Sequence, residues 1–141
     1  MLKYIYIFSF LITLVSCSAN DNLANCIIPA SVSITTDLNN PQLISALVPG
    51  GFANITGGYK NILLVNVNGT DYIAYDKICP ANDCNSAMNF KNGLVLKCSC
   101  DGSEYGVGKG IGGRPLTDGF LCSAIEYRVI KNGSAIRITN F

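Results

Sequence analysis

Short apolar runs alternate with turn residues along most of the chain, and this pattern is typical of β-strands. Within the stretch Cys26 to Thr36, the apolar Val32 and Ile34 alternate with Ser and Thr, which predicts a strand with one buried face. Asn39-Asn40-Pro41 then interrupts the pattern. Residues 42–48 fit either one turn of helix or an irregular loop. The first third of the domain is therefore predicted to be one strand followed by a connection that is either a helical turn or an irregular loop.

Three Asn-Gly pairs mark hairpins in the rest of the chain. Asn68-Gly69, Asn92-Gly93 and Asn132-Gly133 each lie between two apolar runs. Such a setting predicts a type I′ turn, which needs positive φ at both central residues. Since no helical period lasts longer than a turn or two, we expect an all-β domain. The predicted core comprises Ile62, Leu64, Tyr72, Ala74, Val95, Ile125, Tyr127, Val129, Ile136 and Ile138.

Four of the seven cysteines lie in two short loops, C-P-A-N-D-C at 79–84 and C-S-C-D-G-S at 98–103. Paired cysteines of this kind suggest a metal site, a disulfide clasp, or the remains of a metal site that has become a disulfide clasp. The chain has no histidine, which excludes histidine-based catalytic triads and the usual zinc sites. Asp101 and Glu104 are interpreted as a solvated turn. We therefore expect a protein without an enzymatic active site.

Charge adds little to this picture. The chain has 10 basic and 9 acidic residues, and charged residues make up only 13% of it. No basic stripe is present, so nucleic acid is not an expected partner.

The first 17 residues have the pattern of an export signal. Lys3 precedes an apolar run over residues 4–15, which is too short to span a bilayer as a lasting helix. The run ends in L-V-S-C, which resembles the lipobox of bacterial lipoproteins and implies cleavage before Cys17 and acylation of its thiol. The alternative is an ordinary signal peptide with a chance cysteine.

The lipobox divides the chain into three expected parts: a lipoprotein signal peptide (1–16), a lipidated tether (17–25) and a single domain (26–141). We expect an exported protein that the acylated cysteine holds in a bilayer of the bacterial envelope, since two or more acyl chains give stable anchoring. The outer membrane or the cell surface is favoured over the inner membrane. A ligand or another envelope protein is the expected further partner.

The two cysteine loops resemble the two boxes of the Rieske iron–sulfur domain, C-x-H-x-x-C and C-x-C-H-G-S. Cys79 and Cys98 match the two cysteine ligands of its 2Fe–2S cluster. Cys84 and Cys100 match the pair that forms a disulfide in the cytochrome bc type of Rieske protein. Residues 113–116 (G-R-P-L) loosely resemble the proline loop over the cluster. The resemblance implies an all-β, Rieske-like antiparallel sandwich or small barrel with a cysteine-loop subdomain.

The chain departs from this family at both histidine ligands, which are replaced by Ala81 and Asp101. A Rieske cluster holds one iron through two thiolates and the other through two imidazoles. Ala81 has no donor atom, so we expect neither a cofactor nor a metal. If a cluster is bound nevertheless, its ligands would be Cys79 and Cys98, with Asp101 or with Cys84 and Cys100.

The remaining cysteines suit three disulfides, because a lipidated Cys17 would leave six in an exported chain. Six cysteines allow many connectivities, and only the resemblance selects among them. It implies the disulfide that forms in the cytochrome bc type of Rieske protein, and a second disulfide between the two cysteines that would share an iron. The last two cysteines would then tie the N-terminal strand to the C-terminal part. The implied pairs are Cys84–Cys100, Cys79–Cys98 and Cys26–Cys122.

Three functions follow from these observations. The favoured one is a binding or structural envelope lipoprotein in which disulfides replace the metal site. The second is electron transfer through a 2Fe–2S cluster with unusual ligands. The third is a thiol–disulfide redox module that uses Cys98-Ser99-Cys100, although Asp101 opposes a low thiol pKa and Lys97 is the nearest cation. The motifs I-I-P-A-S-V (27–32), L-N-N-P-Q (38–42), V-P-G-G (48–51) and T-G-G-Y (56–59) resemble those of small Bacteroidota envelope lipoproteins with Rieske-like domains. This resemblance implies a fold and a location but no activity.

Overall fold

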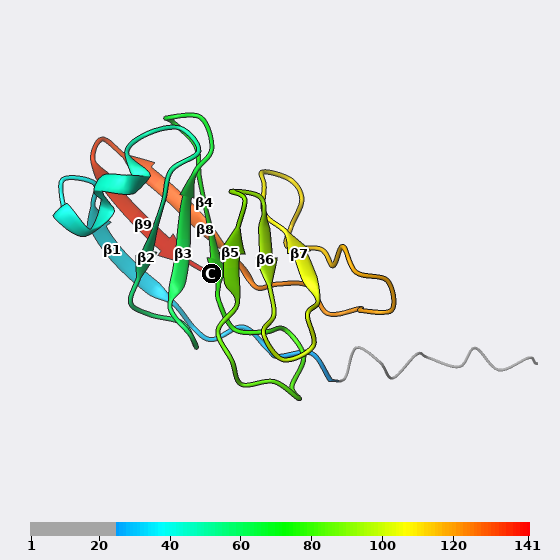
Figure 1. Cartoon of the computed structure of the whole chain (residues 1–141). Coiled ribbons are helices and arrows are strands. Elements are labelled where there is room, and N and C mark those ends of the chain that lie inside the picture. Colours follow the sequence, from blue (N-terminus) through cyan, green and yellow to red (C-terminus); the bar gives the residue numbers. More distant parts are fainter. Residues whose placement is uncertain (1–24) are drawn as a thin grey trace, which may run out of the picture.

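The computed structural model describes residues 25–141, which form two antiparallel β-sheets (Figure 1). The larger sheet has the strand order β1-β9-β8-β4-β3-β2: β1 (Ser33–Asp37), β2 (Phe52–Ile55), β3 (Ile62–Asn66), β4 (Tyr72–Asp76), β8 (Glu126–Asn132) and β9 (Ala135–Thr139). The smaller sheet has the order β5-β6-β7: β5 (Asn89–Lys91), β6 (Val95–Lys97) and β7 (Glu104–Gly106). The prediction of an all-β antiparallel fold is confirmed.

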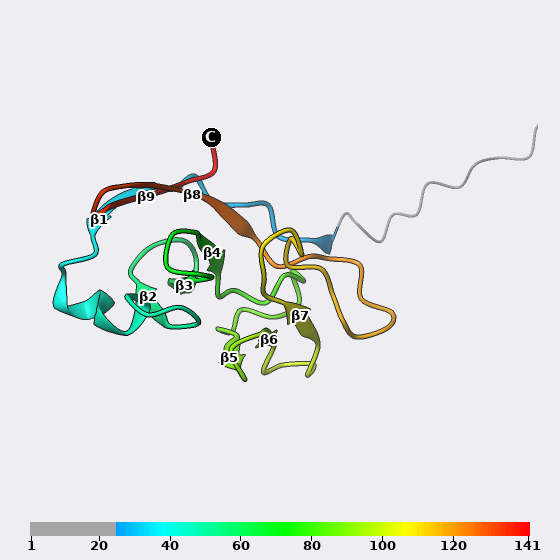
Figure 2. The same cartoon turned by 90° about the horizontal axis from the view of Figure 1, so that it is seen from above.

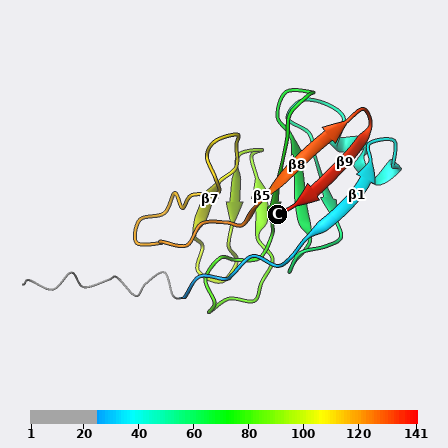
Figure 3. The same cartoon turned by 180° about the vertical axis from the view of Figure 1, so that it is seen from behind.

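We call the six-stranded sheet with its connections the body, and residues 77–125, which lie between β4 and β8, the cysteine-loop subdomain. The chain therefore leaves the body once and returns to it once. The shortest ladder in the sheet of the body is the one between these two strands, because β4 and β8 pair only through Ala74↔Tyr127 and Tyr75↔Glu126. Seen from above, the sheet curls at this line into a half-barrel, with β1, β9 and β8 as one layer (Figure 2). Figure 3 shows that layer from behind.

All three Asn-Gly hairpins form, but only one has the predicted turn. Asn92 and Gly93 both have positive φ (55° and 71°), as a type I′ conformation requires. In the last hairpin Asn132 pairs with Ala135, so the turn is centred one residue later, on Gly133-Ser134. In the first hairpin the Asn68 carboxamide accepts hydrogen bonds from the backbone N–H groups of Thr70 and Asp71 and holds a longer loop.

The first strand begins later than the pattern predicted. Strand β1 starts at Ser33, whereas Cys26 forms only an isolated bridge with Ala81. The stretch after Asn40 is a short 3-10 helix, η2 (Pro41–Ala46). The Asn40 side chain caps it by accepting a hydrogen bond from the Gln42 N–H at 3.0 Å. Of the two expectations for residues 42–48, the helical turn is confirmed.

Two apolar clusters fill the molecule. One lies inside the body and includes Ile62, Leu64, Ile136 and Ile138, each with no exposed surface. The other joins the outer face of β3 and β4 to the cysteine-loop subdomain. Of the predicted core residues, only Val95 and Val129 are partly exposed.

The N-terminal predictions lie outside the part of the chain that the structure describes. These are the signal peptide over residues 1–16, the lipidated Cys17 and all but the last residue of the tether. Within residues 25–141, no helix has the length and apolar character needed to cross a membrane.

Candidate functional site

The two cysteine loops are held by their own backbone hydrogen bonds. In the first loop, the Cys84 N–H donates to the Ala81 carbonyl at 3.3 Å. In the second loop, the Cys98 N–H donates to the Ser103 carbonyl at 2.8 Å, and Gly102 adopts a φ of 75°. A side chain at position 102 would be strained in that conformation, which accounts for the glycine that follows Asp101.

The structure brings the six cysteines of the domain to disulfide distance in three pairs. The Cα–Cα distances are 5.4 Å for Cys79–Cys98, 6.1 Å for Cys84–Cys100 and 5.3 Å for Cys26–Cys122. These separations are in the usual range for disulfides. Cys98 and Cys100 belong to different pairs, so the segment Cys98-Ser99-Cys100 is not itself a disulfide loop. The third pair joins the start of the domain to the segment that leads into β8.

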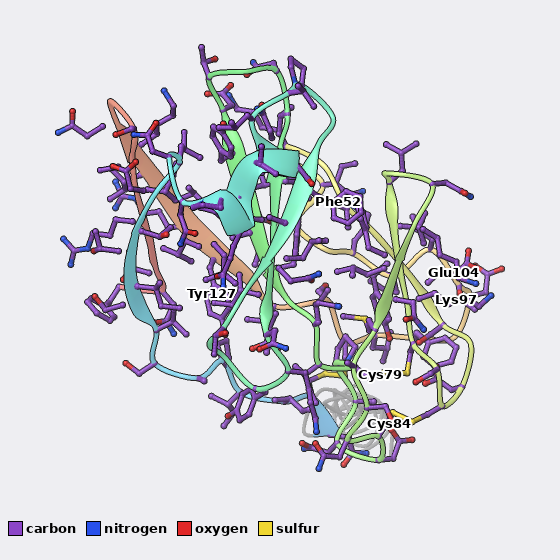
Figure 4. The ribbon with its side chains drawn as sticks, turned by 60° about the vertical axis from the view of Figure 1, so that its left-hand side comes forward. Phe52, Cys79, Cys84, Lys97, Glu104 and Tyr127 are labelled. Carbon is purple, nitrogen blue, oxygen red and sulfur yellow. A yellow bond between two sulfur atoms is a disulfide. The ribbon has the colours of Figure 1, made fainter. Side chains whose placement is uncertain are left out.

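The four sulfurs of the cysteine loops form one compact group, which we call the clasp. All four Sγ atoms of Cys79, Cys84, Cys98 and Cys100 lie within 4.8 Å of one another. The sulfurs of Cys84 and Cys98, which belong to different pairs, are 3.6 Å apart. Figure 4 shows Cys79 and Cys84, the two cysteines of the first loop, at one end of the molecule, with the disulfide bonds in yellow. Of the four residues only Cys100 is exposed.

The residues at the two histidine positions do not provide ligands for a Rieske cluster. The Asp101 carboxylate accepts hydrogen bonds from the Ser103 N–H at 2.8 Å and the Ser103 hydroxyl at 2.6 Å, so it caps its own turn. Ala81 offers only its backbone, which pairs with Cys26. With both histidines missing and four sulfurs joined in pairs, the donor set does not fit a cluster that needs two imidazoles on one iron.

The N-terminal segment, residues 25–28, lies along the first cysteine loop. The Ile27 N–H donates to the Pro80 carbonyl at 2.8 Å, and the Asn82 N–H donates to the Asn25 carbonyl at 2.8 Å. This segment was predicted to begin a strand, and sequence reasoning missed its contact with the loop. A hollow of about 560 Å³ opens between the two, lined by Ile27, Ile28, Tyr59, Ile78, Asn82 and Asn85 together with Cys26 and Cys84.

Asp76 anchors the clasp to the body, and sequence reasoning also missed it. It is fully buried at the end of β4, three residues before Cys79. Its carboxylate accepts hydrogen bonds from the N–H groups of Tyr59 (2.7 Å), Lys60 (3.2 Å) and Ile78 (2.9 Å) and from the Tyr127 hydroxyl (2.9 Å). A buried carboxylate is tolerated only when it is hydrogen-bonded in this way. An acidic residue that ends a wholly apolar strand was the signal in the sequence.

Tyr105 lies beside the second loop and reports the electrostatics there. Its hydroxyl is 2.9 Å from the Ser103 hydroxyl. Burial raises the pKa of Tyr105, and the nearby carboxylates Asp101 and Asp83 raise it further, against the Ser103 hydrogen bond, which lowers it. Lys97, the cation nearest to Cys98-Ser99-Cys100 in the sequence, donates to the Glu104 carboxylate at 2.9 Å. The Lys97 ammonium is therefore engaged by a carboxylate of the neighbouring strand.

The neighbouring G-R-P-L segment (113–116) extends the smaller sheet. The Gly106 N–H donates to the Arg114 carbonyl at 3.0 Å, and the Leu116 N–H donates to the Glu104 carbonyl at 2.7 Å, so residues 114–116 extend the edge of β7. The residues after it, 119–122, line a second hollow with Ala81 and Asp83. The Cys26–Cys122 disulfide holds this stretch beside the first cysteine loop.

Comparisons with known proteins show similarity at the level of the fold. No family model matches the chain, and no curated protein matches it. Among solved structures it is similar to the ferredoxin of carbazole 1,9a-dioxygenase from Nocardioides aromaticivorans (16% identity, TM-score 0.47), over 80% of this chain and 98% of that one. It is also similar to a protein assigned as the small subunit of an NADPH nitrite reductase (13% identity, TM-score 0.45), over 77% of this chain and 99% of that one. Both neighbours have a Rieske-like fold, and these likenesses carry no weight for the function of this chain.

Proposed function

We propose that this protein is a binding or structural module of the bacterial envelope, built on a Rieske-like scaffold in which two adjacent disulfides take the place of the metal site. The lipid anchor at Cys17 belongs to this proposal and rests on the lipobox alone. The disulfides would keep the two cysteine loops together, which is the structural task that a cluster performs when it bridges two loops.

One observation carries the proposal: the four sulfurs that could face a metal are paired, and neither Ala81 nor Asp101, at the two histidine positions, offers an imidazole. Asp101 already accepts two hydrogen bonds from Ser103. The Ala81 backbone is engaged by the N-terminal segment. An exported protein meets an oxidising environment, in which facing thiols close to disulfides.

The hollow beside the clasp supports a binding role. It is lined mainly by apolar side chains, of which Ile28 is 80% exposed and Tyr59 50% exposed. Asn82 and Asn85 add amide groups at its edge. A pocket of this size with an apolar wall and a few polar groups suits a small organic ligand or a peptide side chain.

The test is to purify the protein both in air and without oxygen, and then to measure iron, visible absorption and free thiols. The proposal predicts a colourless, iron-free protein with no free thiol at Cys79, Cys84, Cys98 or Cys100. Stoichiometric iron with a 2Fe–2S spectrum that is lost in Cys79→Ser would overturn it. Zinc in place of iron, with four free thiols after chelation, would overturn it as well.

A cluster held by all four cysteines is the second candidate, because the four sulfurs lie within 4.8 Å of one another. It would require both disulfides to be absent and both pairs of sulfurs to turn toward iron. The anaerobic arm of the same purification distinguishes it, since only the cluster protein would be coloured.

The anchor has its own test. In a bacterial host that processes lipoproteins, Cys17→Ser should abolish lipid modification and move the protein from the membrane to the soluble fraction. The matched control is Ser16→Ala, which leaves the acceptor thiol in place. Unchanged fractionation of Cys17→Ser would remove the anchor from the proposal and leave the clasp untouched.

A further inference from the structure

The two disulfides of the clasp are in contact with each other, which a purely structural pair does not require. The Sγ atoms of Cys84 and Cys98 are 3.6 Å apart although they belong to different disulfides. Thiol–disulfide exchange proceeds by attack of a thiolate on a neighbouring disulfide sulfur. If either of these two sulfurs is freed, the other disulfide is therefore within reach.

The two disulfides also differ in access. Cys100 is exposed, while Cys84 is 3% exposed and Cys79 and Cys98 are each 1% exposed. Access decides which sulfur an external thiol attacks. A reductant from solution is expected to enter at Cys100, at the outer end of the Cys84–Cys100 bond, and the inner disulfide is shielded from it.

We propose that the clasp is a two-electron disulfide relay that accepts electrons from an external dithiol at Cys100 and passes them inward through the Cys84···Cys98 contact. This inference rests on the proposed pairing of the four cysteines. It concerns the same site and adds an activity to it.

The steps balance in atoms and electrons. A thiolate of the dithiol attacks the Cys100 sulfur, and the Cys84 thiolate leaves. The Cys84 thiolate attacks the Cys98 sulfur, so that a Cys84–Cys98 bond forms and the Cys79 thiolate leaves. The second thiol of the dithiol then releases Cys100 and closes the dithiol to its own disulfide. Two electrons enter the protein, and the two protons of the dithiol end on Cys79 and Cys100.

The surroundings of the clasp favour onward transfer. The Cys84 sulfur is 3.6 Å from the Cys98 sulfur, so a freed Cys84 thiolate has the inner disulfide within reach. The product disulfide joins Cys84 and Cys98, which are both buried. Further attack from solution is thereby hindered, and reduction of the clasp should pause after two electrons.

The experiment traps the relay with dithiothreitol as the dithiol. Wild-type protein is first mapped by non-reducing digestion and mass spectrometry, which tests the pairing by itself. It is then treated with one equivalent of dithiothreitol, quenched with N-ethylmaleimide and mapped again. The relay predicts a Cys84–Cys98 cross-link, with label on Cys79 and Cys100. Label on Cys84 and Cys100, with Cys79 and Cys98 still joined, would overturn the relay and leave the proposed function standing.

A single-cysteine variant gives a second measurement without any reductant. Cys79→Ser leaves Cys98 unpaired beside the Cys84–Cys100 disulfide. Exchange should move the free thiol to Cys100, so most of the N-ethylmaleimide label is expected on Cys100 and not on Cys98. Should that variant not fold, Cys100→Ser is the mirror experiment, with label expected on Cys79 in place of Cys84. The matched control is Cys26→Ser, in which the label should stay on Cys122. Label confined to Cys98 in the first variant, or to Cys84 in the second, would overturn the relay.

Discussion

The body and the cysteine-loop subdomain differ in the length of their strands and in the residues that fill their cores. Strands β3 and β4 have five residues each and all ten are buried, whereas β5, β6 and β7 have three residues each. Among residues 25–141, the apolar cluster inside the body contains no cysteine. The cluster of the subdomain includes Cys79, Cys84 and Cys98 among its buried members.

This difference shows how covalent bonds can replace secondary structure. A three-residue strand forms few ladder hydrogen bonds and offers one or two core-facing positions, so it gains little from burial. Disulfides lower the conformational entropy of the unfolded chain and do not depend on strand length. We infer that the body would hold its sheet without cross-links, and that the loops of the subdomain depend on theirs.

The largest effect is expected from the longest cross-link. Cys26–Cys122 spans 96 residues, and in the chain-entropy model its removal costs roughly 4–5 kcal/mol as an upper value. Cys26→Ala with Cys122→Ala should therefore lower the free energy of unfolding more than Cys79→Ala with Cys98→Ala, whose loop spans 19 residues. Urea denaturation of both double variants measures the difference. A larger loss from the shorter loop would show that packing of the sulfurs, and not chain entropy, dominates.

The next comparison uses one leucine from each region. Leu64 in the body and Leu96 in the subdomain are both fully buried, and truncation to Ala should cost roughly 2–5 kcal/mol in each case. We expect Leu64→Ala to open the whole sheet and Leu96→Ala to loosen β5 to β7 while the disulfides persist. Hydrogen exchange of the backbone amides distinguishes the two outcomes.

Two checks sharpen the leucine comparison. Leu94 is 65% exposed beside Leu96, so Leu94→Ala should change the stability by no more than roughly 0.5 kcal/mol. Addition of a reductant should then distinguish the two regions in the same hydrogen-exchange measurement. Leu96→Ala is expected to lose the β5 to β7 protection entirely, and Leu64→Ala should change far less. Equal sensitivity of both variants to the reductant would contradict the division into two kinds of region.

The hairpins of the body could be predicted from the sequence because they are local. Apolar alternation and an Asn-Gly pair together specify two neighbouring strands, and the β3–β4 and β8–β9 pairs formed where they were expected. The exact turn was less predictable, since Asn68 satisfies backbone N–H groups with its side chain and thereby selects a longer loop. Strand β2 was not predicted although it pairs with the neighbouring β3, because no Asn-Gly pair marks the connection between them.

The candidate site was predictable only in part, for a similar reason. The two cysteine loops are visible in the sequence because each is short and their motifs are distinctive. Asp76 gave only one signal, an acidic residue at the end of an apolar strand, and its donors could not be predicted because they come from the segment around Tyr59 and from Tyr127 in β8. The hollow beside Ile28 was also invisible, since the N-terminal segment and the first loop meet only in the folded chain. Periodicity reports which face is buried, but it does not report which buried groups meet.

Alkaline pH should weaken the junction between the two regions. Tyr75 on β4 packs into the subdomain core, and burial, with a smaller contribution from Glu126, raises its pKa to about 12 from an ordinary value of 10.0. The raised pKa means that the folded state keeps the phenol proton more tightly than the unfolded state. This stability is fully present below pH 10 and is lost as the pH rises toward 12, at up to about 1.4 kcal/mol per pH unit.

Tyr75→Phe tests this alkaline effect, because the variant has no phenol to ionise. Its stability should fall less steeply between pH 10 and 12 than that of the wild-type protein. Absorbance at 295 nm follows tyrosine ionisation directly, and the exposed Tyr59 serves as the control through Tyr59→Phe. A wild-type slope unchanged in Tyr75→Phe would assign the alkaline loss to other groups, of which Tyr127 is the first, because burial and Asp76 raise its pKa as well.

The smallest effect is expected from the ion pair that links the two regions at the surface. Lys109, in the loop after β7, donates to the Asp71 carboxylate at 2.6 Å, and Asp71 lies in the turn between β3 and β4. The hydrogen bond from Lys109 is the main cause that lowers the pKa of Asp71 from its ordinary value of 3.8, with the Asn68 side chain second. The stabilisation is therefore present above pH 3.8 and is lost as the pH falls through the lowered pKa.

Lys109→Ala should move that pKa back toward 3.8 in an NMR titration, with little change in stability because the pair is exposed and screened by salt. Lys97→Ala, which breaks an ion pair within the subdomain, should leave the pKa of Asp71 unchanged. A shift of Asp71 in both variants would mean that general surface charge, and not this one contact, couples the subdomain to the body.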